Sequence, residues 1–469
     1  METSIQQIFK AQLGRALEMR SKSIQHRLDK IISIKKWILN NRTLIHEALF
    51  SDLRRSKQDT DIFEVFPVTS EINNTIKNLR KWAKPKAVPS GLSFIGTQSY
   101  ILPEPKGVCL IIAPWNFPFN LVMIPLITAI AAGNTIIIKP SEHSPATSMV
   151  IQNLIEELFE YSDVAVVQGA VEETQELLQL PFNHIFFTGS TEIGKVVMTA
   201  AAKHLTSVTL ELGGKSPVIV DDSANIEDSA RKIVWGRFVN CSQTCLSPDY
   251  IFVHESKENV LIDALKHQVQ ILFDHKNEGF NKTQNYSRLI HEKHTSRIID
   301  MLEQAKKDGA KVEFGGDYQV NDNYIAPTLL SNVKESSEVW TKEIFGPVLP
   351  IKSYNEISEV INHINMNPKP LSLYLFSQNK NTQNKISQET SSGSLVMNDV
   401  VLQYSQHNLP FGGVNNSGIG KSHGYYGFLD FSNQKSVLKQ RIGLTNAFPF
   451  YPPFTHWKEK FIEFAINYL

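Results

Sequence analysis

Short runs of apolar, mostly β-branched residues alternate with longer amphipathic stretches through the first half of the chain. The runs predict strands at residues 107–112, 135–138, 164–167 and 184–187, and the stretches between them predict helices at residues 119–132, 146–159, 172–178 and 193–202. A strand that reads as continuously apolar is buried on both faces, so this alternation indicates βαβ units in a parallel, doubly wound α/β sheet. Such a sheet binds nucleotides beyond the carboxyl ends of its strands.

The pattern on either side of this region predicts further elements. Residues 5–56 are polar with apolar positions at helical spacing, which predicts a helix pair with a solvated basic face, and residues 71–82 predict another helix. Pro and Gly punctuation up to residue 105 predicts extended strands outside the main sheet. A second alternating series, from residue 216 to about residue 375, predicts another α/β lobe.

Composition narrows the class of protein. With 469 residues, 42% of them apolar and 20% charged, the chain is a folding protein of more than one lobe. Lys plus Arg (47) equals Asp plus Glu (47), so no net field recruits nucleic acid or an anionic membrane. Three cysteines offer no disulfide framework and fit a reducing compartment. Without a signal sequence or an integral membrane segment, we expect a cytoplasmic protein.

Two loops at predicted strand ends have the chemistry of a nucleotide site. The segment Phe-Thr-Gly-Ser-Thr-Glu-Ile-Gly-Lys, with Gly189 and Gly194, joins a strand to a helix, where free N–H groups favour a phosphate. It lacks the G-x-G-x-x-G dinucleotide fingerprint, and taken alone it favours a plain glycine turn between strand and helix. Lys139 and Glu142 follow another strand, where a carboxylate accepts from ribose hydroxyls, although a charged loop has the same sequence.

Two further segments suggest covalent chemistry. Glu211 lies in an apolar run just before paired glycines, where burial would raise its pKa toward that of a useful base; the alternative is an exposed strand end. Cys241 and Cys245 share a polar turn, and either is a candidate nucleophile, an inert buried thiol or half of a metal site. Only one histidine, His254, follows nearby, which disfavours a metal.

Taken together, seven segments closely resemble the successive signatures of the aldehyde dehydrogenase superfamily. They are Pro-Trp-Asn-Phe-Pro (114–118), Lys-Pro-Ser-Glu (139–142), Phe-Thr-Gly-Ser (187–190), Leu-Glu-Leu-Gly-Gly-Lys (210–215), Gln-Thr-Cys (243–245), Glu-Ile-Phe-Gly-Pro (343–347) and Pro-Phe-Gly-Gly-Val (410–414). They occur in the family's order over residues 70–440, and the joint match is far more specific than any one motif. The chain looks nearest to the class 3 branch, which includes fatty and aromatic aldehyde dehydrogenases.

This resemblance implies a catalytic mechanism. Cys245 would attack the aldehyde carbon to give a thiohemiacetal, whose hydride leaves for the nicotinamide. The side-chain amide of Asn116 and the backbone N–H of Cys245 would hold the developing oxyanion. Glu211 would then activate the water that hydrolyses the thioester, so the product is a carboxylic acid.

The resemblance also implies the cofactor and its contacts. In this family the dinucleotide binds an atypical Rossmann-type sheet, which accounts for the missing fingerprint. We expect NAD to be preferred and NADP tolerated, because Glu142 would repel a 2′-phosphate while Lys139 offsets it. No metal is expected. The cofactor-binding residues implied are Trp115, Lys139, Glu142, Gly189, Ser190, Gly194, Gly213, Glu343 and Phe345.

Class 3 relatives are dimers built through a small bridging β segment, and we expect a homodimer here. The implied domains are a dinucleotide-binding domain (1–84 and 106–210), an α/β catalytic domain (211–403), bridging segments (85–105 and 404–440) and a C-terminal tail (441–469). Two positions depart from the family pattern, because Ser242 and Asn415 stand where glycine is common. Their β-carbons would narrow these turns.

Two other hypotheses remain open from the sequence. One is an acylating dehydrogenase, or an acyl-thioester or acyl-phosphate reductase, on the same fold; the presence of Glu211 argues against it. The other is a catalytically silent binding protein, which would be expected to lack the nucleophile or the oxyanion donor. The identity of the aldehyde is not determined by the sequence, although a medium-chain or aromatic aldehyde fits the branch.

Overall fold

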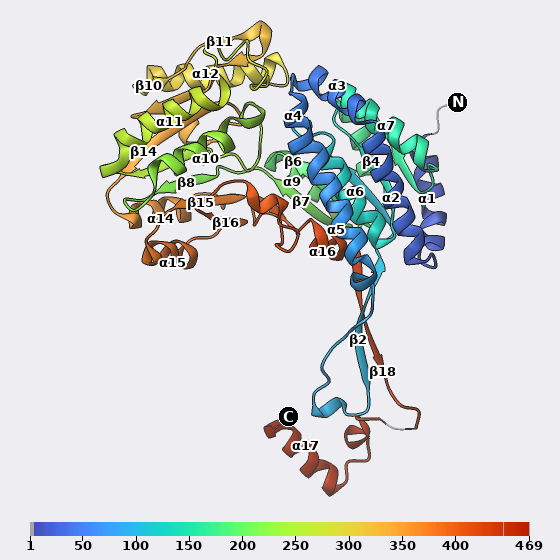
Figure 1. The fold of residues 1–469 in the computed structure, drawn as a ribbon. Coiled ribbons are helices and arrows are strands. Elements are labelled where there is room, and N and C mark those ends of the chain that lie inside the picture. The colour runs from blue at the N-terminus through green and yellow to red at the C-terminus, as the bar shows by residue number, and fades with distance from the viewer. Residues whose placement is uncertain (1–3, 444, 469) are drawn as a thin grey trace.

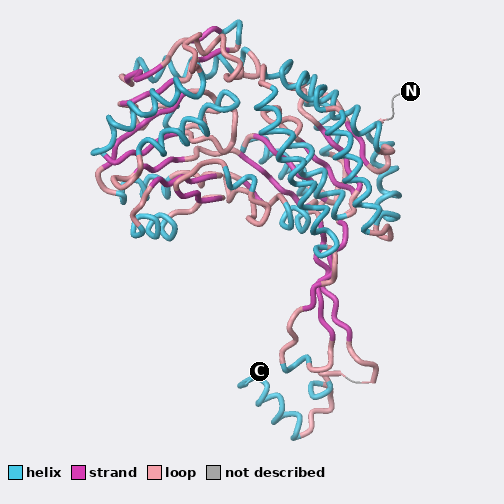
Figure 2. Tube along the Cα trace, in the orientation of Figure 1, coloured by secondary structure: helices cyan, strands magenta, loops and turns pink. Residues whose placement is uncertain are grey.

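The computed structural model describes residues 4–443 and 445–468. Figure 1 shows two α/β lobes side by side, with a long arm projecting from the lobe that contains the N-terminal helices. Figure 2 shows strands sandwiched between helices in both lobes, whereas the arm is built of strands and loops with the C-terminal helix at its tip. The site described below lies where the two lobes face each other.

The first lobe is a six-stranded sheet in the order β17-β7-β6-β3-β4-β5, parallel except for β17. Its strands are β3 (Val108–Ile112), β4 (Thr135–Lys139), β5 (Val164–Val166), β6 (His184–Gly189), β7 (Ser207–Leu212) and β17 (Gly418–Ile419), and its crossover helices are α6 (Asn120–Ala132), α7 (Pro145–Leu158), α8 (Val171–Leu178) and α9 (Thr191–Ala202). Every residue of β3 and β4 is buried. The predicted parallel, doubly wound sheet is therefore confirmed.

The N-terminal helices cover this sheet, and here the prediction was partly wrong. Instead of a helix pair there are three helices, α1 (Ile5–Met19), α2 (Ile24–Asn40) and α3 (Arg42–Leu53). Periodicity alone does not reveal the break before α2, where the Ser23 side chain accepts from the N–H of His26 and starts a new helix. A continuous helical stretch follows, with α4 (Lys57–Thr60), a π turn η1 (Asp61–Val65) and α5 (Phe66–Trp82).

The second lobe contains a seven-stranded sheet in the order β10-β13-β14-β9-β8-β15-β16, parallel except for β10. Its elements are β8 (Pro217–Val220), α10 (Ile226–Phe238), β9 (Tyr250–His254), α11 (Glu258–Phe273), α12 (Glu292–Lys307), β10 (Lys311–Phe314), β13 (Thr328–Ser331), α13 (Glu338–Thr341), β14 (Val348–Tyr354), α14 (Ile357–Met366), β15 (Ser372–Phe376), α15 (Lys380–Glu389) and β16 (Ser394–Met397). β11 (Tyr318–Gln319) and β12 (Tyr324–Ile325) form a separate pair. The second predicted lobe is confirmed, but it extends beyond residue 375.

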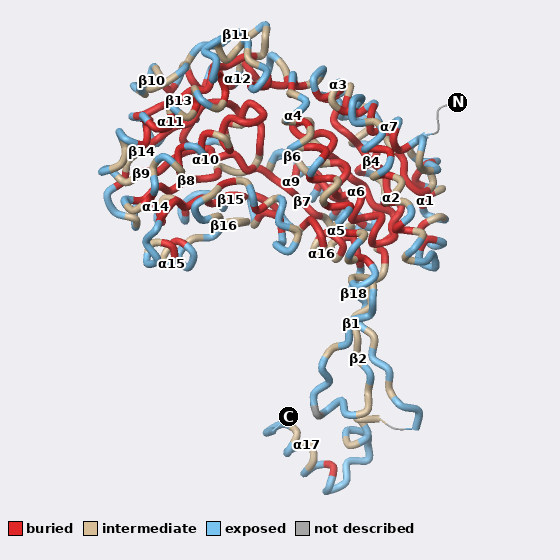
Figure 3. The backbone as a smooth tube through the Cα atoms, in the orientation of Figure 1, coloured by how far each residue is buried: buried red, intermediate tan, exposed pale blue. Residues whose placement is uncertain are grey.

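The arm is a three-stranded antiparallel sheet, β1-β2-β18, outside both main sheets as predicted. It consists of β1 (Lys86–Ala87), β2 (Gln98–Pro105) and β18 (Ser432–Lys439), and the chain then runs to the terminal helix α17 (His456–Tyr468). Figure 3 shows buried residues filling both lobes and mostly exposed backbone along the arm. Just before β18, helix α16 (Gly424–Asp430) packs on α6 of the first lobe. Among the described residues no helix is both long and apolar enough to cross a membrane.

Candidate active site

Cys245 lies in the loop after α10 and the 3-10 turn η3 (Val239–Ser242), where the second lobe faces the first. Its half-buried side chain lines an apolar cavity of about 310 Å³. The neighbouring Cys241 is fully buried, with its sulfur 3.5 Å from the Tyr286 hydroxyl. Of the two thiols in this turn, Cys245 is the one that a substrate can reach.

The walls of this cavity are mostly apolar, and five of the lining side chains are aromatic. An apolar lining around a single thiol suits a substrate that has a hydrocarbon body and one polar end. The aromatic residues lining it are Phe63, Phe66, Phe117, Trp235 and Tyr404.

The surroundings of Cys245 keep its thiol protonated at rest. Burial raises the pKa of Cys245 to about 12, and the negative charges of Glu211 and Glu343 add to the effect. A thiol of this kind is not a nucleophile by itself, since the thiolate is the reactive form. It needs a base nearby and a positive charge beside the sulfur when the reaction begins.

Glu211 is a base with suitable properties. It lies in β7, opposite Gly418 of β17, and only 8% of its surface is exposed, so the alternative of an exposed strand end is wrong. Burial raises the pKa of Glu211 to about 7, against the opposing effect of a hydrogen bond that the Ser422 hydroxyl donates at 2.6 Å. A carboxyl with this pKa exchanges protons readily near neutral pH.

Asn116 connects the first lobe to the Cys245 loop. The side-chain amide of Asn116 donates to the backbone carbonyl of Gln243 at 3.0 Å. The backbone carbonyl of Asn116 accepts from the side-chain amide of Asn240 at 2.9 Å. A side-chain amide has two N–H donors, so one remains for an oxyanion. Asn116, the predicted oxyanion donor, therefore lies against the loop that carries Cys245.

The sequence did not reveal the buried ion pair that holds Asn116 in place. Arg55 and Glu64 pair with both side chains fully buried, and Arg55 also donates to the Asn116 carbonyl and to the Asn240 side chain, each at 2.6 Å. Glu64 in turn accepts from the N–H of Asn120 at 2.7 Å. The sequence predicted a solvated basic face for residues 5–56, and Arg55 departs from it because its partner Glu64 lies on the next helical stretch.

Three of the predicted cofactor residues lie together where β6 turns into α9. Ser190 is the N-cap of α9 and accepts from the N–H of Ile193, leaving the other first-turn N–H groups directed beyond the strand end. Gly189 ends β6, and Gly194 lets α9 approach the sheet, since a β-carbon there would lie 2.6 Å from Leu212. Free N–H groups at a helix start of this kind are able to bind a phosphate.

Lys139 and Glu142 follow β4 on the same edge of the sheet. Lys139 is buried, donates to the carbonyl of Pro140 at 2.8 Å and lies 3.5 Å from the carboxylate of Glu142. Glu142 is itself 38% exposed. A cation and a carboxylate at this edge fit the hydroxyl groups of a ribose.

Residues from the second lobe complete the crevice. The rings of Trp115 and Phe345 meet edge to face at 5.5 Å, and His294, which the sequence did not single out, packs against both. The ring of His294 also bonds the Phe345 carbonyl at 2.8 Å and supports its left-handed backbone conformation. Burial raises the pKa of Glu343 to about 8.

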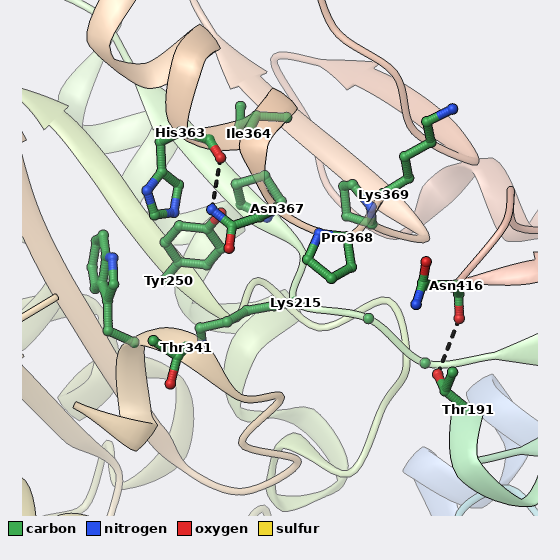
Figure 4. Close-up of a pocket in the computed structure, with 15 residues that line it drawn as sticks. Thr191, Lys215, Tyr250, Thr341, His363, Ile364, Asn367, Pro368, Lys369 and Asn416 are labelled. Carbon is green, nitrogen blue, oxygen red and sulfur yellow. Dashed lines mark hydrogen bonds between the residues drawn. The ribbon is translucent and has the colours of Figure 1, made fainter. Parts of the chain in front are cut away.

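A second cavity of about 230 Å³ lies between the lobes (Figure 4). Thr191, the first residue of α9, and Gly213 both line it, together with Lys215, whose ammonium pairs with Asp249 at 2.8 Å. A β-carbon on Gly213 would collide with the Glu343 carboxylate. Thr191 of the predicted phosphate turn and Gly213, which lies against Glu343, therefore border one interlobe space.

The two departures from the family pattern have a common backbone explanation. Ser242 has φ +63° and Asn415 has φ +54°, both in the left-handed region that favours glycine. Asparagine tolerates this region better than most residues, whereas serine gains nothing there, since its buried hydroxyl has no partner among the described residues.

Replacing Ser242 with glycine should therefore stabilise the protein. We expect the free energy of unfolding to rise by about 1 kcal/mol, because left-handed strain and an unpaired buried hydroxyl are both removed. Thermal unfolding measures the change, with Asn415→Gly as the matched control of smaller effect. A lower unfolding temperature for Ser242→Gly would contradict this explanation.

Comparisons with known proteins agree with the sequence and the fold. A model of the aldehyde dehydrogenase family matches residues 2–437. The chain is 43% identical over 419 residues to the 4,4'-diaponeurosporen-aldehyde dehydrogenase of Staphylococcus aureus, covering 89% of this chain and 90% of that protein. It is 40% identical over 448 residues to aldehyde dehydrogenase family 3 member A2 of Mus musculus, covering 95% and 91%. A substrate-bound structure of Staphylococcus aureus AldH superposes with a TM-score of 0.94 at 40% identity, over 99% of this chain and 100% of that one.

A doubly wound sheet, a thiol lining an apolar cavity and a buried carboxylate define a dinucleotide-dependent dehydrogenase that uses covalent catalysis. The chain belongs to the aldehyde dehydrogenase family, and its likeness to the family 3 protein confirms the predicted class 3 branch. It is an enzyme that oxidises aldehydes with NAD(P), by the mechanism typical of the family. The hypothesis of a catalytically silent binding protein is therefore wrong.

Proposed function

We propose that this enzyme oxidises medium-chain or aromatic aldehydes to carboxylic acids in the cytoplasm, as a homodimer that prefers NAD. The observation that carries the proposal is the Cys245 thiol in the wall of an aromatic-lined cavity, with Glu211 buried nearby. Three free cysteines support a reducing compartment.

The proposed reaction begins with proton transfer from Cys245 to Glu211. The thiolate attacks the aldehyde carbon, and the oxygen that becomes negative accepts from the Asn116 amide and the Cys245 N–H. A bound dinucleotide, held by the residues named below, would supply the hydride acceptor and a positive charge that favours the thiolate. Loss of hydride leaves a thioester on Cys245, and Glu211, once deprotonated again, removes a proton from the attacking water. The carboxylic acid then leaves and the thiol is regenerated.

The residues present fit a dinucleotide along the interlobe crevice. We assign the adenosine ribose to Lys139 and Glu142, the pyrophosphate to the Gly189, Ser190 and Gly194 turn, and the nicotinamide end to Trp115, Gly213, Glu343 and Phe345. Glu142 keeps a partly exposed carboxylate near the ribose, which would repel a 2′-phosphate and favour NAD. Lys139 lies close enough to offset this effect, so NADP is tolerated.

Steady-state kinetics with both cofactors and a series of aldehydes test the substrate and cofactor proposals. Each added methylene should raise kcat/KM about fourfold until the cavity is full, since burial of a CH₂ group is worth about 0.8 kcal/mol. Benzaldehyde and hexanal should therefore exceed acetaldehyde, and NAD should exceed NADP by about tenfold. A preference for acetaldehyde, or for NADP, would contradict the respective proposal.

The arm supports the homodimer. An open strand edge and exposed apolar side chains on a projecting element are features of a surface that another chain covers. Leu438 on β18 is 55% exposed, and the segment beyond it exposes further aromatic residues, namely Phe448, Phe450, Tyr451, Phe454, Trp457, Phe464 and Tyr468.

Light scattering tests this assembly. The mass in solution should be twice the 53.0 kDa of one chain, and Leu438→Lys should shift the protein toward monomer, because a charge then faces the partner. Leu205→Lys is the matched control, since Leu205 is exposed in the loop between α9 and β7 of the first lobe. A monomeric wild type would rule out the homodimer.

A further inference from the structure

Each turnover releases a proton from a buried base. Oxidation of an aldehyde by NAD and water gives a carboxylate, NADH and two protons. In the proposed mechanism the Cys245 proton passes to Glu211 and must leave it before hydrolysis, the water proton returns through Glu211 to the sulfur, and the other released proton comes from the carboxylic acid after it departs. The 310 Å³ substrate cavity is apolar and holds the acyl group during hydrolysis, so it is a poor route for a proton. The inference below rests on this proposed role of Glu211.

A small cavity of about 20 Å³ lies on another side of Glu211. Glu211, Thr188, Ser422 and His423 all line it. A cavity of this size holds one water molecule when polar groups surround it. A proton therefore passes from Glu211 to a water molecule in this small cavity without crossing the substrate cavity.

His423 connects this cavity to a second one. Only 4% of His423 is exposed, its Nδ1 has no hydrogen-bond partner among the described residues, and its ring is held between Tyr404 and Phe411. The second cavity, of about 10 Å³, is lined by His423, Glu71, His407 and Ser70. An unpaired ring nitrogen in the core is costly, which points to a function for this histidine.

The second cavity ends in a hydrogen-bonded chain that reaches the surface. Glu71 is fully buried and its carboxylate bonds Nδ1 of His407 at 2.9 Å, while Nε2 of His407 bonds the Ser70 hydroxyl at 2.9 Å. The His407 side chain is 21% exposed and Ser70 is half-buried, so both reach solvent. Glu71 also accepts from the N–H of Gly424, next to His423.

We propose that His423, with water in the two small cavities, carries protons from Glu211 to His407 and Ser70 at the protein surface. A neutral imidazole accepts a proton at one nitrogen and releases one from the other. Burial lowers the pKa of His423 to about 4, with Glu71 opposing and His407 reinforcing the shift, so the ring is neutral at pH 7 and acts only in transit.

The series Ser70, His407 and Glu71 also has the order of a hydrolase triad. Ser70, however, lies within helix α5, and the adjoining cavity of about 10 Å³ has no room for an ester. A proton, which needs only water and hydrogen bonds, fits this space.

His423→Asn, His407→Gln and Ser70→Ala test the route. Asparagine tolerates the left-handed backbone of His423 (φ +68°) but is not a base. We expect kcat to fall by about tenfold in His423→Asn and His407→Gln and less in Ser70→Ala, with the first-turnover burst of NADH retained. Added imidazole should restore kcat of the two variants at the surface end of the route, His407→Gln and Ser70→Ala. A merely structural defect would not be repaired in this way. His26→Asn, at a histidine in α2 whose Nε2 is also unpartnered, is the control.

The outcomes separate this route from the proposed function. If Glu211→Gln loses turnover while His407→Gln and Ser70→Ala keep kcat within about twofold of wild type, the route is wrong and the base assignment stands. Loss of the burst together with turnover, or a loss that imidazole does not repair in His407→Gln, also overturns the route. If Glu211→Gln turns over normally, the assignment of the base fails. Should His423→Asn fail to fold, the two outer variants still decide.

Discussion

Cys245→Ala is expected to lower kcat by about 10⁴-fold while leaving NAD binding intact, because the covalent thiohemiacetal and thioester no longer form. Absorbance of NADH measures the rate, and calorimetric titration with NAD measures binding. The cavity and the cofactor crevice keep their walls in this variant, so the loss falls on chemistry and not on the fold.

Cys241→Ala is the matched control for this experiment. Cys241 is fully buried beside Tyr286 and does not line the substrate cavity, so kcat should stay within about twofold while the free energy of unfolding falls by about 1 kcal/mol. If Cys241→Ala were inactive and Cys245→Ala active, the nucleophile would be the other thiol.

Glu211→Gln is expected to lower kcat by about 10²- to 10³-fold, since glutamine accepts no proton from water. Both the first-turnover burst of NADH and the later turnovers should be slower, because Glu211 takes a proton from Cys245 before the burst and from water during hydrolysis of the thioester. In the wild type, a Glu211 pKa of about 7 means that protonation removes the base below that pH, so kcat should rise through pH 7. This rise should be absent from Glu211→Gln. Strict dependence of wild-type turnover on coenzyme A would instead revive the acylating alternative.

The same substitution should stabilise the protein in alkaline solution. The folded-state pKa of Glu211 lies above its usual 4.5, so its contribution to stability is complete below pH 4.5 and is lost as the pH rises through about 7. Glutamine avoids this loss, and the gain above pH 7 is at most about 3 kcal/mol. Urea unfolding at pH 5 and pH 8 measures it.

The central strands were predictable because each is buried on both faces. The predicted strands at 107–112 and 135–138 differ from β3 and β4 by a single residue at one end. The apolar residues of these segments favour a buried strand and no alternative local structure. Helix ends were less predictable where capping decides them, as at Ser23.

Long-range polar contacts limited the prediction of the site. The family motifs place Cys245, Glu211 and Asn116 in one reaction, yet no local pattern shows that Ser422 donates to Glu211 from 211 positions away, or that Arg55 holds Asn116. Charged residues that pair across such distances have the same local sequence as solvated ones. Burial distinguishes them, and burial becomes known only once the fold is known.

The arm has a consequence for the order in which the protein is made. Residues 98–105 leave the ribosome more than 300 residues before their ladder partner, 432–439. During that interval β2 has an unpaired edge, which is where premature association begins in large nascent proteins. Folding of the arm is thus a non-local event, and any pairing of two chains through the completed arm must follow the synthesis of β18.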